Sequence, residues 1–361
     1  MHYFIFPNKD SYITTEFQQK NFGSDEILEL RKIFSGSFST SAEAASRILI
    51  QFDYSDISSS IVNGDITNPK YYLRLYEVEG QTELDKSYSL SSFPLSQSWE
   101  EGTGKYFNDP KSKKGVTWID YDSGSVWSLV SNTNADSGSL GTGGGVWITG
   151  SSYEVSQSFT NRSGDIEMDV TDIVNKHLDS TISNNGFILK FKGSDETDGT
   201  PQNFKFFSRD TNTIYSPKLE VRWDDSSFST GDLTQLTMSG ELENHIFIKG
   251  LQSKYRETEK VRFRIGCRKK YVQKTFTESV LTSSFYVPES SGSYSIIDIA
   301  TDTPIVPFSD YTKLSADATS MYFDQWFNTF EPGRYYKVLF KLKYNDGQEI
   351  IYDNVEEFKI I

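Results

Sequence analysis

Residues Ser46–Ser58 read SRILIQFDYSDIS, an apolar strand that runs into an acidic turn and then into a short segment with one isoleucine. Ile48, Ile50 and Phe52 share one face at a period of two, and Leu49 points to the other face, where it can meet a second layer. This pattern predicts the central strand of a β-sandwich.

A second strand is predicted just upstream. Residues 19–24 (QKNFGS) form a turn in which Gly23 suits a positive φ angle, and Ile27–Leu30 follow as an apolar segment. The two segments are expected to form one hairpin or to be neighbouring strands.

These residues resemble the opening of the DNRLRE family, whose pattern is Asn-aromatic-Gly, a strand with Leu, and then Arg-x-Leu-x-x-Phe-Asp. Further segments are similar to later parts of that family and occur in the same order: Ser98–Glu101, Gly115–Trp118, Asn185–Leu189, Phe207–Arg209 and Pro217–Val221. The resemblance covers residues 8–224. DNRLRE domains occur in bacterial surface proteins, in polysaccharide-active proteins and in phage particles. The resemblance implies a jelly-roll-like β-sandwich that at most binds carbohydrate or a surface, and it does not imply catalysis.

Length and charge predict two domains. The chain has 361 residues, enough for a core in each of two domains. Residues 1–225 carry 20 Lys and Arg against 32 Asp and Glu, whereas residues 226–361 carry 16 against 18, and the polar segment Asp224–Asp232 joins them. We therefore predict an all-β protein in which a jelly-roll-like sandwich (1–225) precedes a smaller Ig-like sandwich (226–361). The acidic first domain argues against a nucleic-acid partner.

The single cysteine and the apolar runs bear on the compartment. Cys267 alternates with Ile265 and Phe263, which predicts a buried structural thiol and excludes an intrachain disulfide. The apolar runs are strand-sized, so no membrane insertion is expected, and Met1–Phe6 lacks the length and cleavage site of a signal peptide. These features favour a protein made in the host cytoplasm and released in a virion.

A long polar, Gly-rich insertion occupies residues 96–152, and Trp118, Trp127 and Trp147 are spaced through it. An insertion of this length in a compact domain is typically functional or a contact arm. If the first domain binds glycan, the expected contacts are Tyr121, Trp127 and Trp147, because apolar sugar faces stack on exposed rings. Trp99 and Trp118 match family positions and are expected in the core. The glycine run at 141–145 is expected to allow close backbone approach beside Trp147.

Two further patterns each allow a purely structural and a functional interpretation. Asp195 and Asp198 lie in an acidic segment before Gly199, which is either a hairpin tip or a calcium site, although the spacing of a calcium loop is missing. No other cofactor is expected. In the second domain Arg262, Arg264 and Arg268 lie on one face of a strand and are continued by Lys269, and this basic face is either solvated or a docking surface for an acidic partner.

Catalysis is not expected. The only histidines are His2, His177 and His245, and no triad or zinc motif surrounds them. Adjacent Glu100 and Glu101 point apart if extended, unlike the facing carboxylates of a glycosidase.

Two non-enzymatic classes remain. One is a structural protein of a tailed bacteriophage particle (neck, tail, baseplate or capsid decoration), which implies other virion proteins, copies of itself in a symmetric assembly and a possible host-surface glycan as partners. The other is a carbohydrate-binding module of a surface or polysaccharide-active protein.

Overall fold

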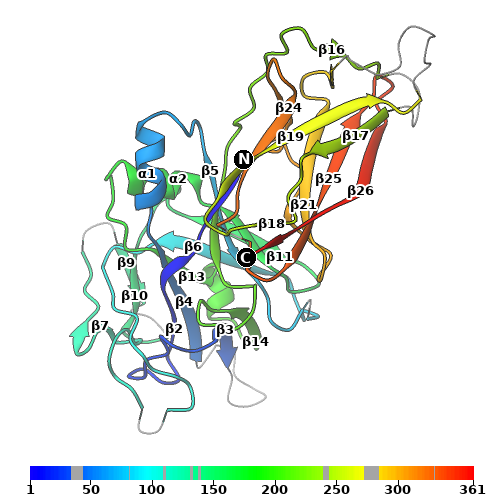
Figure 1. The fold of residues 1–361 in the computed structure, drawn as a ribbon. Helices are drawn as coiled ribbons and strands as arrows, with labels where there is room; N and C mark the ends of the chain where they lie inside the picture. The colour runs from blue at the N-terminus through cyan, green and yellow to red at the C-terminus, as the bar shows by residue number, and fades with distance from the viewer. Residues whose placement is uncertain are drawn as a thin grey trace, which may run out of the picture. The chain divides into compact units, whose positions relative to one another are not determined.

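The computed structural model describes residues 1–33, 44–80, 82–108, 111–130, 133–136, 140–238, 244–271, 284–328 and 330–361, without the side chains of 135–136. The described chain forms two compact units. The larger unit comprises Ile5–Asn63 and Lys70–Val221, and the smaller unit comprises Met1–Phe4, Gly64–Pro69 and Arg222–Ile361. Both are built from multistranded sheets with little helix (Figure 1), which confirms the predicted all-β sandwich fold. Independent folding of residues 1–225 and 226–361 stays a prediction.

The larger unit contains a main sheet and a second sheet. The strand order of the main sheet is β11 (Val155–Phe159), β6 (Tyr88–Pro94), β13 (Phe187–Phe191), β4 (Ala44–Phe52), β3 (Ile27–Ile33) and β14 (Gln202–Phe207), and β2 (Pro7–Thr14) also pairs with β4. The second sheet includes β15 (Lys218–Arg222), β5 (Lys70–Leu75) and β12 (Ile166–Asp169) in that order. Two ribbons, β7 (Asp120–Asp122) with β8 (Ser125–Val126) and β9 (Thr133–Asp136) with β10 (Gly143–Ile148), and three helical segments, α1 (Ser55–Val62), α2 (Thr171–Leu178) and η1 (Gly193–Glu196), complete it.

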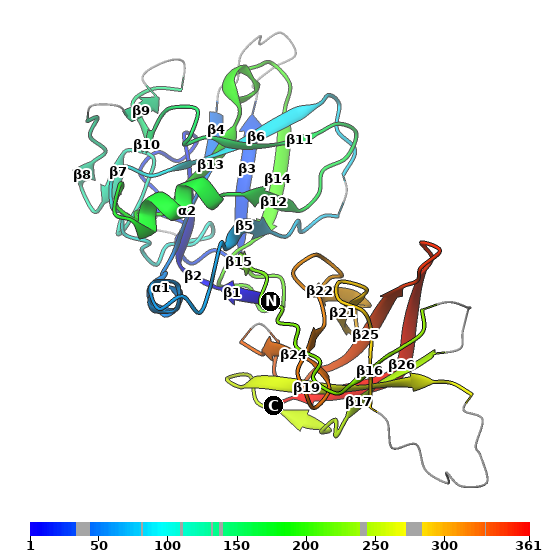
Figure 2. The ribbon, with the colours of Figure 1, turned by 90° about the horizontal axis from the view of Figure 1, so that it is seen from above.

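Strand β4 is the central strand of the main sheet, as predicted (Figure 2). Its Ile50 lies opposite Phe187 of β13 on one side and opposite Asp10 of β2 on the other. Ile48, Ile50 and Phe52 are buried, and so is Leu49 on the opposite face. Both faces of the sheet are therefore covered. The segment after the strand, predicted as a turn, continues into the helix α1.

The insertion at residues 96–152 covers the face of the main sheet on which Leu49 lies. Its tryptophans Trp99, Trp118 and Trp147 pack in one buried cluster against residues of the main sheet, including Leu49 and Ile188. A Cβ atom on Gly144, whose φ is +77°, would overlap the Trp118 ring and the Arg47 guanidinium, so only glycine fits there. The described part of the insertion is thus a third layer whose glycines permit close packing beside Trp118.

A buried arginine joins this layer to the sheet. The Arg47 guanidinium lies 4.7 Å from the Trp118 ring centre and 5.0 Å from that of Trp147. It donates to both carboxylate oxygens of Glu196, at 2.8 and 3.0 Å, and to the carbonyl oxygen of Gly144 at 2.7 Å. The Lys190 ammonium lies 2.6 Å from the same carboxylate. Burial raises the pKa of Glu196, but these two cations outweigh burial and hold the pKa below its usual range.

The smaller unit contains two sheets of its own. One has the order β17 (Asn244–Lys249), β19 (Lys260–Lys269), β24 (Met321–Trp326) and β23 (Ser315–Ala316). The other has the order β18 (Lys254–Tyr255), β26 (Glu349–Ile360), β25 (Tyr335–Lys343), β21 (Gly292–Asp298) and β22 (Thr303–Val306), and β16 (Thr234–Gln235) pairs with β20 (Phe285–Tyr286). The chain start, β1 (His2–Ile5), is tied to this unit by the Met1 ammonium, which donates to Trp223 O at 2.5 Å and lies 3.0 Å from Asp225.

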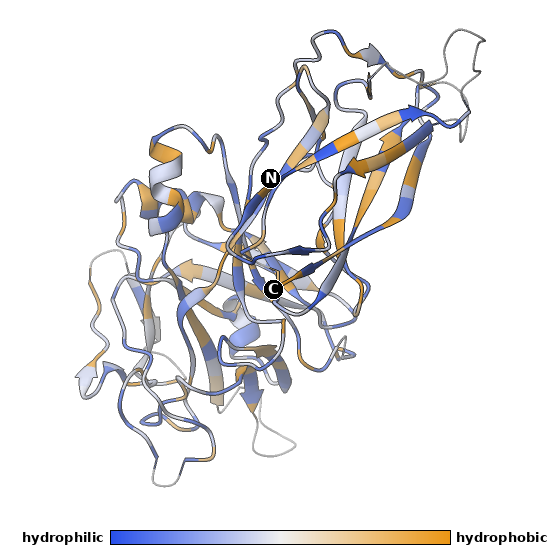
Figure 3. Cartoon of the chain, viewed as in Figure 1, coloured by the Kyte–Doolittle hydropathy of each residue, from blue (hydrophilic) through white to orange (hydrophobic). Residues whose placement is uncertain are grey.

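Alternation in β19 follows the prediction. Phe263, Ile265 and Cys267 are buried, whereas Arg262, Arg264 and Arg268 are exposed or partly exposed. Hydrophobic and hydrophilic residues show as bands along β19 in Figure 3. Burial raises the pKa of the Cys267 thiol to about 12, as expected for a structural cysteine.

Among the described residues no helix is both long and apolar enough to span a bilayer.

The third layer yields a test of stability. Trp118→Ala should lower the free energy of unfolding by about 3–5 kcal/mol, because a buried ring and its packing are lost. Val126→Ala, in the same insertion at 58% exposure, should change it by less than about 0.5 kcal/mol. Urea denaturation measures both variants. Equal effects of the two substitutions would contradict the packing described here.

Candidate functional site

An open pocket of about 500 Å³ lies where the insertion meets the main sheet of the larger unit. We call it the Tyr106 pocket. Strand β2 contributes Tyr12, the start of β3 and the turn before it contribute acidic and basic residues, and the insertion contributes three consecutive residues at the rim. The lining residues are Tyr12, Asp25, Glu26, Ile27, Glu29, Arg31, Lys105, Tyr106 and Phe107.

The rim of this pocket is aromatic and accessible. The Phe107 side chain is 91% exposed, and its ring meets that of Tyr106 edge to face at 5.2 Å between centres. The Tyr106 ring in turn packs against Phe17 at 6.1 Å and lies 5.1 Å from the Lys20 ammonium. Tyr106 is therefore held in place, while Phe107 offers a free ring face to solvent.

Carboxylates lie beside these rings. Asp25 accepts the backbone N–H of Tyr106 with both oxygens, each at 3.0 Å. Burial raises the pKa of Asp25, and this backbone hydrogen bond opposes the rise. Glu29 lies 3.4 Å from Arg31, and Glu26 lies 3.5 Å from Lys105, at partly exposed positions. The pocket thus combines hydrogen-bond acceptors and donors with an exposed apolar ring.

Asn21 holds the insertion at the position that forms the pocket. Its buried side-chain amide donates to the carbonyl oxygens of Glu101 and Val116, at 2.6 and 2.7 Å. Its oxygen accepts the backbone N–H of Gly104 at 2.7 Å. The Asn-aromatic-Gly segment is consequently a clamp on the insertion, a role that its place in a predicted turn did not indicate.

A buried acid makes a second attachment. Asp10 of β2 accepts the backbone N–H of Arg209 at 2.7 Å, and its own N–H donates to Glu101 at 2.9 Å. Burial raises the pKa of Asp10 to about 8, and burial also raises the pKa of Glu101. Two acids with elevated pKa values therefore lie at the joint between β2 and the insertion.

The predicted glycan contacts are only partly brought together. Tyr121 and Trp127 meet edge to face at 6.1 Å, and both are half-buried against the third layer. Trp147 is only 5% exposed, with Phe93 at 6.0 Å and the Arg47 guanidinium at 5.0 Å. The exposed position expected for Trp147 is therefore corrected: its ring belongs to the core, because it lies on β10 facing the main sheet.

Asp195 and Asp198 are brought together by lysines. Lys86 lies 3.0 Å from Asp195 and also contacts Asp198, while Lys32 lies 2.8 Å from Asp198. Burial raises the pKa of Asp198, but its hydrogen bonds from Lys32 and Lys86 outweigh burial and hold the pKa below its usual range. Within the described residues no group of three or more metal-ligating side chains occurs. The calcium interpretation stays a prediction, and the carboxylates already have cationic partners.

The predicted docking face is partly neutralised within its own sheet. Arg262 makes a two-point contact with Asp324, at 2.7 and 2.8 Å, and lies 4.0 Å from the Tyr322 ring. Arg264 is paired with Asp317 at 2.5 Å. Arg268 donates to the backbone carbonyls of Lys269 and Lys270, and Lys269 is exposed. Among the described residues no carboxylate is paired with Arg268 or Lys269, and the docking role of this face stays a prediction.

His177, one of three histidines, packs rather than titrates. It is buried on α2, with its ring stacked at 5.8 Å from Tyr54, and burial lowers its pKa to about 4.

Sequence reasoning missed the Tyr106 pocket, although two adjacent aromatic residues in a polar, Gly-rich segment were a usable signal.

Comparison with known proteins gives no family. No family model matches the chain, and no curated protein matches it. Among solved structures, the N-terminal domain of the adhesin Sgo0707 from Streptococcus gordonii aligns with 93% of this chain and 66% of its own, at 8% identity and a TM-score of 0.15. The CupB6 tip adhesin from Pseudomonas aeruginosa aligns over 99% and 98%, at 7% identity and a TM-score of 0.09. Likenesses at these scores do not establish a shared fold.

The elevated pKa of Asp10 predicts a pH dependence. Its carboxyl titrates near about 3.9 in an unfolded chain and at about 8 in the folded chain. Between these values the folded state binds more protons, so this group makes stability fall as the pH rises from about 4 to 8. Asp10→Asn keeps an acceptor for Arg209 and should flatten that decline. Urea unfolding at a series of pH values measures it, and an unchanged slope in the variant would count against a buried, protonated Asp10.

Proposed function

We propose that the chain is a non-enzymatic structural protein of a tailed bacteriophage particle and that its larger unit binds a glycan through the Tyr106 pocket. The observation that carries the binding part is the free ring of Phe107 beside the acidic residues of that pocket.

Sugars have the surface that such a pocket complements. The C–H face of a sugar ring is apolar and stacks on an aromatic ring, while its hydroxyls donate hydrogen bonds to carboxylates and accept them from cations. Phe107 supplies the ring, Glu29 and Asp25 supply acceptors, and Arg31 and Lys105 supply donors. Because Tyr106 is already fixed by Asp25, little ordering of the rim is needed on binding.

The proposed role in a bacteriophage particle rests on observations other than the Tyr106 pocket. DNRLRE domains, which residues 8–224 resemble, occur in phage particles as well as in surface proteins. The fold is held by packing around buried charges, and its one thiol is buried, so it needs no oxidising compartment to form. Arg268 and Lys269 suit attachment to an acidic neighbour in a symmetric assembly.

The second candidate is a carbohydrate-binding module of a surface or polysaccharide-active protein. The same pocket favours it, since glycan binding alone does not require a particle. Mass spectrometry of purified phage particles separates the two: recovery of this chain supports the virion role, and its absence from particles supports the module.

Removal of the exposed ring tests the binding site. A glycan array identifies ligands of the intact protein, and calorimetry then compares variants on one of them. Phe107→Ala should weaken binding by about tenfold or more, equivalent to about 1.4 kcal/mol, without lowering thermal stability, because the ring is exposed. Val126→Ala, an exposed apolar residue outside the pocket, is the matched control. An array without ligands, or equal affinities of the two variants, would refute the glycan proposal.

A further inference from the structure

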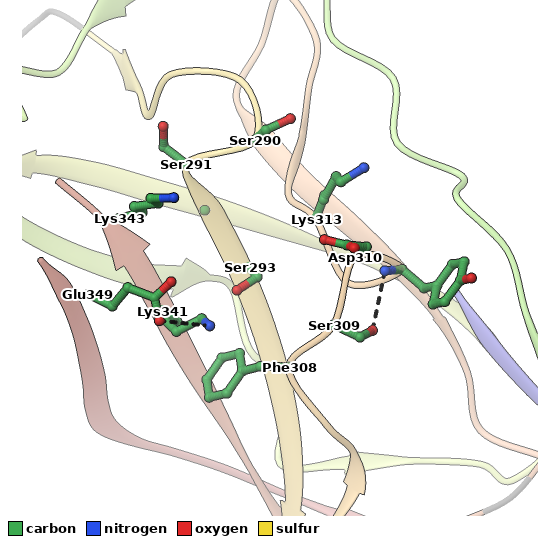
Figure 4. A pocket seen from close by; sticks show the side chains of 12 residues that line it. Ser290, Ser291, Ser293, Phe308, Ser309, Asp310, Lys313, Lys341, Lys343 and Glu349 are labelled. Atoms are coloured by element: carbon green, nitrogen blue, oxygen red, sulfur yellow. Dashed lines mark hydrogen bonds and ion pairs between the residues drawn. The ribbon is translucent and has the colours of Figure 1, made fainter. Parts of the chain in front are cut away.

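A second pocket, also of about 500 Å³, lies in the smaller unit and is lined by lysines and serines (Figure 4). We call it the lysine pocket. Strand β25 contributes Lys341 and Lys343, strand β21 contributes Ser293, and the loop after β22 contributes Phe308 and Lys313. The remaining lining residues are Ser290, Ser291, Gly292, Ser309, Asp310, Tyr311 and Glu349.

Strand register explains why the lysines surround a hollow. Ser293 pairs with Lys341 of β25 on one side and forms a β-bridge with Lys313 on the other. Directly opposed residues of antiparallel strands place their side chains on the same face. A small residue therefore separates two long cationic ones, and the space above Ser293 is left open.

The acids that face the cations in this pocket are exposed to solvent. Lys341 lies 3.1 Å from Glu349, and Lys313 lies 2.8 Å from Asp224, but both acids are substantially exposed. Exposed pairs of this kind contribute at most about 1 kcal/mol, so an incoming anion can compete for either lysine. Lys343 is exposed and has no recorded acidic partner among the described residues. Asp310 also lines the pocket and is exposed, so the three lysines face three acids, Asp224, Asp310 and Glu349, all of them open to solvent.

The other lining groups indicate what accompanies the anionic group. Ser290, Ser291 and Ser293 present hydroxyls, which can donate to and accept from other hydroxyls. Phe308 adds one aromatic ring, over which the Lys341 ammonium lies at 5.4 Å. A ligand that matches all three features carries a negative charge, several hydroxyls and a small apolar face.

We propose that the lysine pocket binds an acidic saccharide, with the carboxylate of a uronic acid residue between Lys341 and Lys343 and the sugar hydroxyls on the serines. This site is separate from the Tyr106 pocket and does not depend on the function proposed for it. It gives the smaller unit a ligand of its own.

Calorimetry with trigalacturonate tests the proposal on the full chain. Trigalacturonate should bind, its fully methyl-esterified form should bind at least about tenfold more weakly, and added salt should weaken binding because the pocket is open to solvent. Lys341→Gln and Lys343→Gln should each weaken binding severalfold, and the double variant by about tenfold or more. Lys254→Gln, at an exposed lysine of the same unit outside the pocket, should leave it unchanged.

Three outcomes would overturn the proposal. They are equal binding of the ester, unchanged binding by the double lysine variant, and equally tight binding of inorganic phosphate, which would mean a site for any anion. Phe107→Ala should not alter trigalacturonate binding at the lysine pocket. If Phe107→Ala abolishes the binding while the lysine variants retain it, the saccharide is bound in the Tyr106 pocket instead.

Discussion

The larger unit depends on one buried ion pair, in which the Arg47 guanidinium contacts the Trp118 and Trp147 rings and is held by Glu196. A guanidinium removed from water needs both a counter-charge and hydrogen-bond acceptors, because the cost of its desolvation is otherwise several kcal/mol. Glu196 and the Gly144 carbonyl satisfy it. Since Gly144 belongs to the insertion and Arg47 to the central strand, this requirement fixes the insertion on the sheet.

That attachment has a consequence for the surface of the larger unit. The insertion, once packed by its tryptophans, leaves Tyr106 and Phe107 at its edge next to the start of β3. Asn21 holds the same edge through backbone groups of the insertion, and the backbone N–H of Asp10 donates to the Glu101 carboxylate there. The Tyr106 pocket is therefore a product of the third layer, and its rim residues contribute little to the core themselves.

The sequence predicted those elements whose signal is local. The alternation of Ile48, Ile50 and Phe52 and the alternation around Cys267 both have a period of two, and both are found. The third layer has no such period. Its tryptophans Trp99, Trp118, Trp127 and Trp147 follow one another at intervals of 19, 9 and 20 residues in polar sequence, so no period distinguishes Trp127 from the three rings that long-range packing buries. Trp147 was consequently expected at the surface.

Charged residues show the same limit. In a hydropathy pattern an arginine on a strand, such as Arg47, counts as a polar residue and predicts an exposed side chain. Its burial is possible only because Glu196, far away in the chain, supplies a counter-charge. Likewise the face of Arg262 and Arg264 reads as basic until Asp324 and Asp317 are placed beside it.

A double-mutant cycle on Arg47 and Glu196 tests the central claim most directly. Arg47→Met and Glu196→Gln should each lower the free energy of unfolding by about 3–5 kcal/mol, because each leaves the other partner buried without its main counter-charge. The double variant should then lose at least about 1 kcal/mol less than the two single losses combined. Losses that add within about 0.5 kcal/mol would show that the two side chains do not act as a pair, and would contradict the account.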